Sequence, residues 1–257
     1  MPGSPFDTRG FSRDEYSVRG VRTVVYCIGE GPAVMYWHGR GTWHGFAWAR
    51  ELRSHHRVLL PYHPGFGESG DDPRIGSLDD YASHYVALLD QLQLSQVPLI
   101  GASFGGFLAA HFAVAHPERV SKLILAAPSG LSSPEYPRPD YRNVPLEALN
   151  AWFVVDTALV EPFWPDRWIE RREREQASGE LALAGSRTGP AFANDLSALK
   201  MPTLILWGRS DRILPVGLAS LWQQALPHAK LRIVDNAGHL LLDESAEARR
   251  ELEIFLR

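Results

Sequence analysis

The chain has 257 residues, of which 45% are hydrophobic and 22% are charged, a composition typical of a globular protein. Its formal net charge of -4 at pH 7 argues against a nucleic-acid-binding protein, because such proteins usually carry a basic face. The single cysteine excludes an intramolecular disulfide and any zinc site built from paired cysteines. Neither a signal peptide nor an apolar run of roughly 20 residues is recognisable, so we expect a cytoplasmic protein without a membrane segment.

Short runs rich in Val, Ile and Leu alternate along the chain with longer segments of helical periodicity. The expected strands are Thr23–Cys27, Ala33–Trp37, Arg57–Leu60, Pro98–Ile100, Lys122–Ala126, Thr203–Trp207 and Leu231–Val234, with an edge hairpin within Tyr16–Cys27. Most are almost continuously apolar, as strands covered on both faces are. Ser77 and Ser245 are expected to cap helices, and Gly105–His116 forms another before Pro117. This alternation predicts an α/β fold with a doubly wound, mostly parallel sheet.

The alternation stops between residues 132 and 195, where no strand is expected. The segment is dense in aromatic residues, namely Tyr136, Tyr141, Trp152, Phe153, Phe163, Trp164 and Trp168. These aromatics are consistent either with a pocket for an apolar or aryl group or with the core of a small helical cap. The charged run Glu170–Glu175 predicts the solvated face of a helix. We therefore expect a single domain, with a core of residues 1–131 and 196–257 and a helical cap insertion at 132–195.

A G-x-S-x-G sequence, Gly101–Gly105, follows one of the expected strands and opens a helix. A sharp strand-to-helix turn lifts the serine hydroxyl above the sheet, and such a turn tolerates only small neighbours. This context predicts Ser103 as a nucleophile and the Phe104 N–H as one oxyanion donor. The alternative is a glycine-rich turn that merely packs a helix against a strand. Only the nucleophile requires a base and an acid elsewhere in the chain.

Two later strands end close to residues that can serve as that acid and base. Asp211 follows the strand Thr203–Trp207, and His239 follows the strand Leu231–Val234. Both therefore belong to the carboxyl edge of the sheet, where the sites of open α/β sheets assemble. The chain order serine, aspartate, histidine is that of hydrolases built on such sheets. We predict His239 as the base and Asp211 as the residue that orients it.

Other acidic residues near these loops receive structural roles. Asp235 adjoins the end of its strand and is expected to brace the loop. Asp243 and Glu244 are expected to help cap the last helix. Of the histidines after Ser103, only His239 combines a preceding strand with a loop.

These motifs together resemble the α/β-hydrolase family over nearly the whole chain. The matching segments are the H-G-x loop Trp37–Gly41, the G-x-G-x-S loop Pro64–Ser69, the elbow Gly101–Gly105, the W-G-x-x-D loop Trp207–Asp211 and the A-G-H loop Ala237–His239. The resemblance implies a helical cap inserted after the sixth strand, which ends at Ala126. It also implies that the Arg40 N–H is the second oxyanion donor, with Gly41 as the donor if the loop is shifted by one. By the same comparison His38 is structural.

Other chemistries are not supported. Gly65–Gly70 matches the dinucleotide pattern G-x-G-x-x-G, but Asp71 and Asp72 follow it and would repel a pyrophosphate. The chain has no H-E-x-x-H zinc motif. An aspartate nucleophile, as in haloalkane dehalogenases and epoxide hydrolases, is excluded because the elbow carries Ser103. We expect neither a cofactor nor a metal.

The resulting expectation is a serine hydrolase that cleaves a carboxylic ester of a small molecule with an apolar or aryl group. The main alternative is a carbon–carbon bond hydrolase of a vinylogous keto acid, of the meta-cleavage-product type. The Pro128–Gly130 loop and Trp207 resemble those enzymes, whereas Leu240 and Leu241 replace a tryptophan-containing segment that often follows their histidine. Lactone hydrolysis, perhydrolysis and a receptor built on a hydrolase fold are further alternatives. No nucleic-acid or membrane partner is expected, and scattered apolar residues identify no subunit interface.

Overall fold

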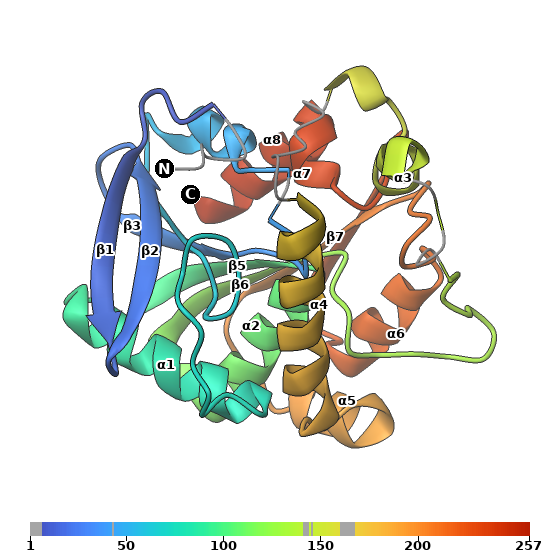
Figure 1. Cartoon of the computed structure of the whole chain (residues 1–257). Helices are drawn as coiled ribbons and strands as arrows, with labels where there is room; N and C mark the ends of the chain where they lie inside the picture. The colour runs from blue at the N-terminus through green and yellow to red at the C-terminus, as the bar shows by residue number, and fades with distance from the viewer. Residues whose placement is uncertain (1–6, 43, 141–143, 145, 160–167) are drawn as a thin grey trace.

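The computed structural model describes the chain except for residues 1–6, 43, 141–143, 145 and 160–167 (Figure 1). Within the described residues, eight strands form one sheet in the order β1-β2-β4-β3-β5-β6-β7-β8. Their bounds are β1 Ser12–Val18, β2 Val21–Ile28, β3 Ala33–Trp37, β4 Arg57–Pro61, β5 Val97–Ala102, β6 Val120–Ala126, β7 Thr203–Gly208 and β8 Lys230–Val234. β1 pairs antiparallel with β2, and β2 with β4, while the other pairs are parallel. The expected edge hairpin and mostly parallel sheet are confirmed.

The burial of each strand follows from its place in the sheet. All six residues of β7 are buried, as expected for an apolar strand covered on both faces. The outermost strand β1 is mostly polar and largely solvent-accessible, and its charged residues discourage pairing with a further chain. The hydrophobic core therefore lies along the parallel strands, which are also the strands that carry the predicted site.

Helices cover both faces of the sheet. Their bounds are η1 Ala47–Leu52, α1 Leu78–Gln91, α2 Phe104–Ala115, η2 Pro117–Arg119, α6 Leu218–Ala225, α7 Leu241–Glu244 and α8 Ala246–Leu256. In Figure 1, α1, α2 and α6 lie below the sheet, whereas α7 and α8 lie above it. The predicted caps are confirmed, because Ser77 Oγ accepts the Asp80 N–H at 3.3 Å and Ser245 Oγ accepts the Ala248 N–H at 3.2 Å.

The segment between β6 and β7 is a helical insertion, as expected. Its described elements are α3 Leu146–Phe153, η3 Thr157–Leu159, α4 Trp168–Ala184 and α5 Gly189–Leu196. The two strands that flank it pair directly, so the sheet is continuous without it. The Gly189 N–H donates to the Gly130 carbonyl at 3.3 Å, which joins the start of the last helix of the insertion to the loop before the insertion. The aromatic residues Tyr141, Phe163 and Trp164 and the side chain of Trp168 lie outside the described residues.

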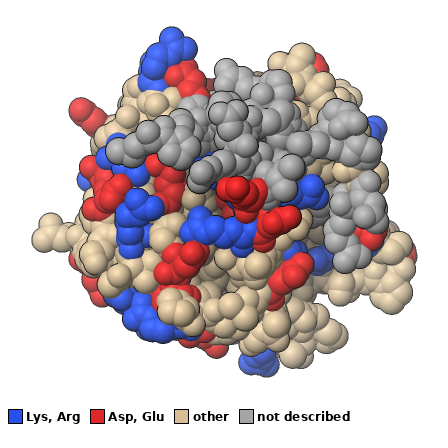
Figure 2. All heavy atoms as spheres, viewed as in Figure 1, with Lys and Arg blue, Asp and Glu red and all other residues tan. Residues whose placement is uncertain are grey.

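Acidic and basic side chains are interspersed over the face shown in Figure 2, which is the face crossed by α4 in Figure 1. Among the described residues, none of the helices combines the length and the apolar character needed to cross a membrane.

Candidate active site

The predicted site residues meet at one edge of the sheet because they follow parallel strands. β3 ends at Trp37, opposite Gly101 near the end of β5. The end of β6 pairs with β5 on one side and with β7 on the other, and β7 pairs with β8. The loops after β3, β5, β7 and β8 therefore open on the same edge. These loops contain Arg40, Ser103, Asp211 and His239, respectively.

Ser103 sits at the turn between β5 and α2 with a φ of 52°, a left-handed conformation that costs a non-glycine residue roughly 1–3 kcal/mol. The backbone is held there by hydrogen bonds on both sides. The Ser103 N–H donates to the Ala126 carbonyl at 2.9 Å, and the Ser103 carbonyl accepts the N–H groups of Phe107 and Ser129. This is the strained strand-to-helix turn that the G-x-S-x-G sequence predicts; the role of Ser103 as nucleophile stays a prediction.

The two outer glycines of that sequence are required by close backbone approach. A Cβ on Gly101 would lie 2.4 Å from the Gly105 carbonyl oxygen. A Cβ on Gly105 would lie 2.2 Å from the carbonyl oxygen of Trp37, at the end of β3. Real Cβ atoms essentially never make such contacts, so the absence of side chains lets α2 pack directly on the sheet beneath Ser103.

Asp211 and His239 form the predicted pair. The His239 Nδ1 lies 2.8 Å from Asp211 Oδ2, and both side chains are buried. The other carboxylate oxygen, Oδ1, accepts the N–H groups of Ile213 and Leu214, each at 2.8 Å. The ionised aspartate accepts hydrogen bonds only, so His239 Nδ1 carries the ring proton and Nε2 is left as the acceptor. That tautomer is the one a general base needs.

The loops carrying this pair are tied to each other and to the core. The N–H groups of Arg209 and Ser210 donate to the carbonyls of Val234 and Ala237, respectively. The buried indole of Trp207 donates to the Leu214 carbonyl at 3.0 Å and so closes the aspartate loop. Asp235, the other aspartate near this site, braces the loop as expected, since it pairs with Arg209 at the surface.

Ser103 and His239 line the same small pocket, of about 60 Å³. Among the hydrogen bonds of the described residues, none joins Ser103 Oγ to His239; catalytic hydrogen bonds are often long until substrate is bound. His44, which sequence reasoning missed, lines this pocket too. Burial and the neighbouring His239 lower the pKa of His44 to about 4, so it is neutral at pH 7.

The predicted oxyanion donors flank Ser103. Phe104 is the first residue of α2, where a helix leaves its N–H groups without intrahelical partners. Gly39 lies against Ser103, since a Cβ built on it would be 3.3 Å from the serine Cβ. Among the described hydrogen bonds, none uses the N–H of the next residue, Arg40. Phe104 follows Ser103 in the chain and Arg40 follows the residue that contacts Ser103, so both N–H groups stay candidates for the oxyanion donors.

The orientation of the Arg40 N–H follows from buried histidines. His38 Nε2 accepts the His63 N–H at 3.1 Å, so the ring proton is on Nδ1 and is donated to the Gly39 carbonyl at 2.7 Å. A trans peptide points its carbonyl and its N–H in opposite directions. Fixing the Gly39 carbonyl therefore fixes the direction of the Arg40 N–H. His38 is structural, in agreement with the sequence-based expectation.

A larger cavity, of about 350 Å³, lies between Ser103 and the insertion. The charged residues that line it are Arg40, Arg138, Asp140, Arg172 and Glu180. Of the described insertion aromatics, Phe153 lines the small pocket, with its ring 5.9 Å from that of His239. Tyr136 and Trp152 instead pack against the hydrophobic core. This cavity therefore has a mixed lining, in which these charged side chains lie beside the apolar residues Leu149, Leu183, Ile213 and Leu214.

The sequence interpretation was wrong for two glutamates. Glu175, assigned to a solvated helix face, is fully buried in α4 and accepts hydrogen bonds from the loops at Thr42 and Gly67. Glu244, expected to help cap the last helix, instead accepts the N–H groups of Gly238 and Val155. Each glutamate connects the insertion to a loop of the site.

Comparisons with known proteins agree with this geometry. Residues 32–154 and 162–246 match the family described as the alpha/beta hydrolase fold. A 2-hydroxy-6-oxononadienedioate/2-hydroxy-6-oxononatrienedioate hydrolase of Pseudomonas putida is 33% identical over 250 residues, covering 89% of this chain and 85% of that protein. A 2-hydroxy-6-oxo-6-phenylhexa-2,4-dienoate hydrolase of Comamonas testosteroni is 30% identical over 261 residues, covering 89% of each chain.

A solved structure shares the fold over nearly the full length. The 2-hydroxy-6-oxo-6-phenylhexa-2,4-dienoate hydrolase of Rhodococcus sp. strain RHA1 has a TM-score of 0.78 at 21% identity, covering 96% of this chain and 99% of that one. The match of the family model over most of the chain and the relatives above 30% identity lead to one assignment. The chain belongs to the α/β-hydrolase family and is a hydrolase.

Proposed function

We propose that the protein hydrolyses a carbon–carbon bond in a 2-hydroxy-6-oxo-2,4-dienoic acid by acyl transfer through Ser103. The observation that carries this proposal is the lining of the cavity above Ser103, in which three arginines, Arg40, Arg138 and Arg172, outnumber the two acidic residues Asp140 and Glu180. A carboxylate is the natural partner of an arginine cluster. The substrates named for the two curated relatives share this chemistry, since both are 2-hydroxy-6-oxo acids.

The proposed reaction begins on the keto tautomer, in which the proton of the 2-hydroxyl has moved to C5. Ser103 Oγ attacks the C6 carbonyl while His239 Nε2 takes the serine proton, and Asp211 stabilises the resulting imidazolium. The N–H groups of Phe104 and Arg40 receive the oxyanion, each contributing roughly 3 kcal/mol in comparable sites. The geometry that supports these roles is the 2.8 Å contact between His239 and Asp211 and the shared pocket of His239 and Ser103.

Bond cleavage then follows from the conjugation of the acid. The C5–C6 bond breaks, and its electron pair passes through the alkene to the C2 ketone, forming a dienolate. The proton held by His239 returns to this product. Water, deprotonated by His239, next hydrolyses the ester on Ser103 and releases a carboxylic acid. Arginines beside the C1 carboxylate would stabilise the dienolate, because negative charge moves toward that end of the substrate.

Ester hydrolysis, which the sequence alone favoured, uses the same nucleophile and donors. What separates the two reactions is the leaving group, which in an ester needs no cationic surroundings. The charged lining of the cavity therefore supports the keto acid over an apolar ester.

The experiment follows the absorbance of 2-hydroxy-6-oxo-6-phenylhexa-2,4-dienoate and 2-hydroxy-6-oxononadienedioate, whose conjugated chromophore is lost on cleavage. We expect turnover of at least one of them by the wild-type protein. Replacement Ser103→Ala should lower kcat by roughly 10⁴-fold or more with no fall in Tm, because only the nucleophile is removed. p-Nitrophenyl butyrate serves as the comparison ester.

Three other results would contradict the proposal. Cleavage of p-nitrophenyl butyrate with kcat/KM well above that of both dienoates would restore the esterase interpretation. Labelling of Ser103 by a fluorophosphonate without turnover of any substrate would favour a receptor. Undiminished dienoate cleavage by Ser103→Ala would exclude the acyl-enzyme mechanism.

A further inference from the structure

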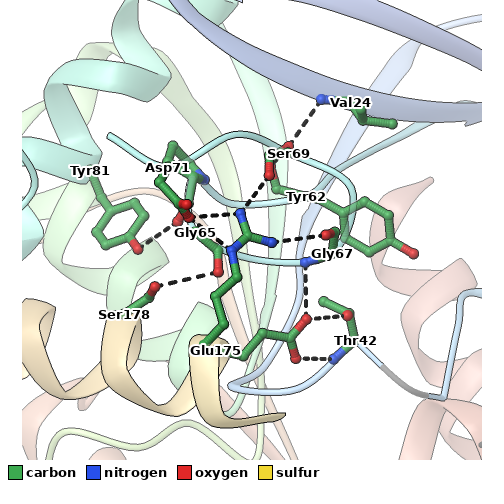
Figure 3. A network of polar contacts seen from close by, with 12 residues as sticks. Val24, Thr42, Tyr62, Gly65, Gly67, Ser69, Asp71, Tyr81, Glu175 and Ser178 are labelled. Atoms are coloured by element: carbon green, nitrogen blue, oxygen red, sulfur yellow. Dashed lines mark hydrogen bonds and ion pairs between the residues drawn. The ribbon is translucent and has the colours of Figure 1, made fainter. Parts of the chain in front are cut away.

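A buried carboxylate in the insertion contacts the loop that carries a proposed oxyanion donor. Glu175 lies in α4 with none of its surface exposed. Its Oε2 accepts the Thr42 N–H at 3.1 Å, and its Oε1 accepts the Thr42 hydroxyl at 2.5 Å and the Gly67 N–H at 2.9 Å (Figure 3). Burial raises the pKa of Glu175, and a buried carboxylate is retained only where donors satisfy it. Here three donors do so.

These bonds hold one end of a four-residue loop, Gly39–Thr42. At its other end, the His38 ring fixes the Gly39 carbonyl, as described above. The loop between the two anchors contains Arg40, whose N–H is the proposed donor. His38 belongs to the core, whereas Glu175 belongs to the insertion.

The same helix contacts the loop at Arg40 as well. A Cβ on Gly179, one turn after Glu175, would lie 2.9 Å from Arg40 Nε, so the arginine side chain packs on this bare position. Glu180 lies 3.5 Å from the Arg40 guanidinium. One side of α4 thus contacts the loop at both Arg40 and Thr42.

A second set of contacts fixes α4 on the core without involving that loop. Arg174 donates to the carbonyls of Gly67 and Ser69 and pairs with Asp71. Ser178 Oγ donates to the Gly65 carbonyl at 3.3 Å (Figure 3). The docking of the helix and its contact with Thr42 can therefore be perturbed separately.

We propose that Glu175 is a positioning residue, which sets the oxyanion loop from the insertion by holding the Thr42 amide and hydroxyl. This inference rests on the proposed serine mechanism, in which the Arg40 N–H binds the oxyanion. The insertion then acts on the transition state as well as on substrate binding. A displacement of the loop by a fraction of an ångström weakens the bond to the oxyanion, whereas the resting substrate loses little.

Glu175→Gln tests this at constant side-chain size. The carboxylate accepts on both oxygens, whereas an amide presents two N–H donors on one side. If the amide oxygen keeps the Gly67 N–H, the amide nitrogen faces the Thr42 N–H, donor against donor. We expect kcat to fall roughly 10-fold with KM nearly unchanged, part of the 10²–10³ lost when a whole oxyanion donor is removed.

The second readout is the rate at which a fluorophosphonate labels Ser103. The serine oxygen attacks phosphorus while His239 takes its proton, and the P–F bond breaks with release of fluoride. The phosphoryl oxygen uses the same donors, so no keto-acid substrate is needed. We expect Glu175→Gln to slow labelling by a similar factor. Thr42→Val, which removes only the hydroxyl donor, should slow labelling by a smaller factor. This variant tests the inference if Glu175→Gln does not fold.

Arg174→Gln is the matched control, because it loosens the same helix without contacting Thr42. It should lower Tm while labelling continues at the wild-type rate. Labelling of folded Glu175→Gln and Thr42→Val at the wild-type rate would overturn the inference alone. Equal slowing by Arg174→Gln would also overturn it, since helix docking would then be the cause. No labelling of the wild type would overturn the proposed function and this inference together.

Discussion

The two walls of the cavity above Ser103 are built in different ways. On the core wall, the functional groups are set by backbone: Ser103 by its strained turn, and Asp211 by two N–H groups that bind one of its oxygens. On the insertion wall, they are long side chains such as Arg138 and Arg172. A group held by the backbone keeps its position when neighbouring side chains change. An arginine side chain, by contrast, can be substituted or reoriented without changing the others. The core wall therefore suits invariant chemistry, and the insertion wall suits variable recognition.

The largest expected effect on kcat comes from a replacement in the core wall, Asp211→Asn. In Asp211→Asn, Oδ1 can keep its bonds to the N–H groups of Ile213 and Leu214, so the amide nitrogen faces His239 Nδ1. The ring proton then moves to Nε2, the atom that must accept the serine proton. We expect kcat to fall about 10⁴-fold, as in a triad held in the wrong tautomer. Steady-state kinetics with the dienoate measures this effect.

Asp235→Asn provides the control for that prediction. Asp235 pairs with Arg209 at the surface and does not contact His239 in the described hydrogen bonds. Its replacement should leave kcat within about twofold of wild type, since exposed ion pairs contribute little. Loss of activity in Asp235→Asn with activity retained in Asp211→Asn would reverse the assignment of the acid.

A smaller effect is expected on the insertion wall. Arg172→Gln removes a positive charge from the cavity. A hydrogen bond to a charged group contributes roughly 1.5–3 kcal/mol, so KM for the dienoate should rise about 10- to 100-fold. Turnover of a neutral ester such as p-nitrophenyl butyrate should not change. Arg187→Gln, which alters an exposed insertion arginine paired with Asp195, should affect neither substrate. An equal loss on both substrates would show that Arg172 serves the chemistry instead.

The smallest effect concerns stability in acid, to which the core and the insertion contribute with opposite signs. Burial lowers the pKa of the core residues His63 and His84 to about 3 and about 4, below the usual 6.5. The unfolded chain therefore takes up their protons first, and the unfolding free energy falls below pH 6.5 by up to about 1.4 kcal/mol per pH unit for each. Glu175, with a raised pKa, takes up its proton first in the folded state and opposes this loss above pH 4.5.

Urea unfolding at a series of pH values between 7 and 4.5 checks both signs. In His84→Gln, the unfolding free energy should fall less steeply with decreasing pH than in the wild type, by the slope that corresponds to about one proton taken up on unfolding. In Glu175→Gln it should fall more steeply. Identical slopes for all three proteins would mean that neither group has a shifted pKa.

The core wall was predictable from sequence because its residues are encoded locally. β3 has the predicted bounds, and the residues assigned as nucleophile, acid and base each lie within a few residues of a strand end. Parallel pairing then brings the strand ends to one edge without further information. The catalytic roles themselves stay predictions, which the variants above test.

The contacts between the insertion and the site loops were not predictable, because the partners are distant in sequence. Glu175 bonds with Thr42, 133 residues earlier, and its neighbours form a charged run typical of a solvated face. A weaker signal was present: among the residues of α4 whose burial is described, Glu175, Gly179 and Ala182 are the buried ones and follow helical spacing. A glutamate on the same stripe as a glycine and an alanine indicates a side that packs closely against something.

The hydrogen bond between Gly189 and Gly130 bears on whether the insertion of this protein could be exchanged for another. Because β6 pairs directly with β7, and α5 is tied to the loop before the insertion, a segment of different length placed between them would not need to open the sheet. The insertion behaves as an exchangeable cassette. If Glu175 acts as proposed, an enzyme with an exchanged insertion would have a new specificity. It would turn over slowly unless the new insertion also supplied a carboxylate for Thr42.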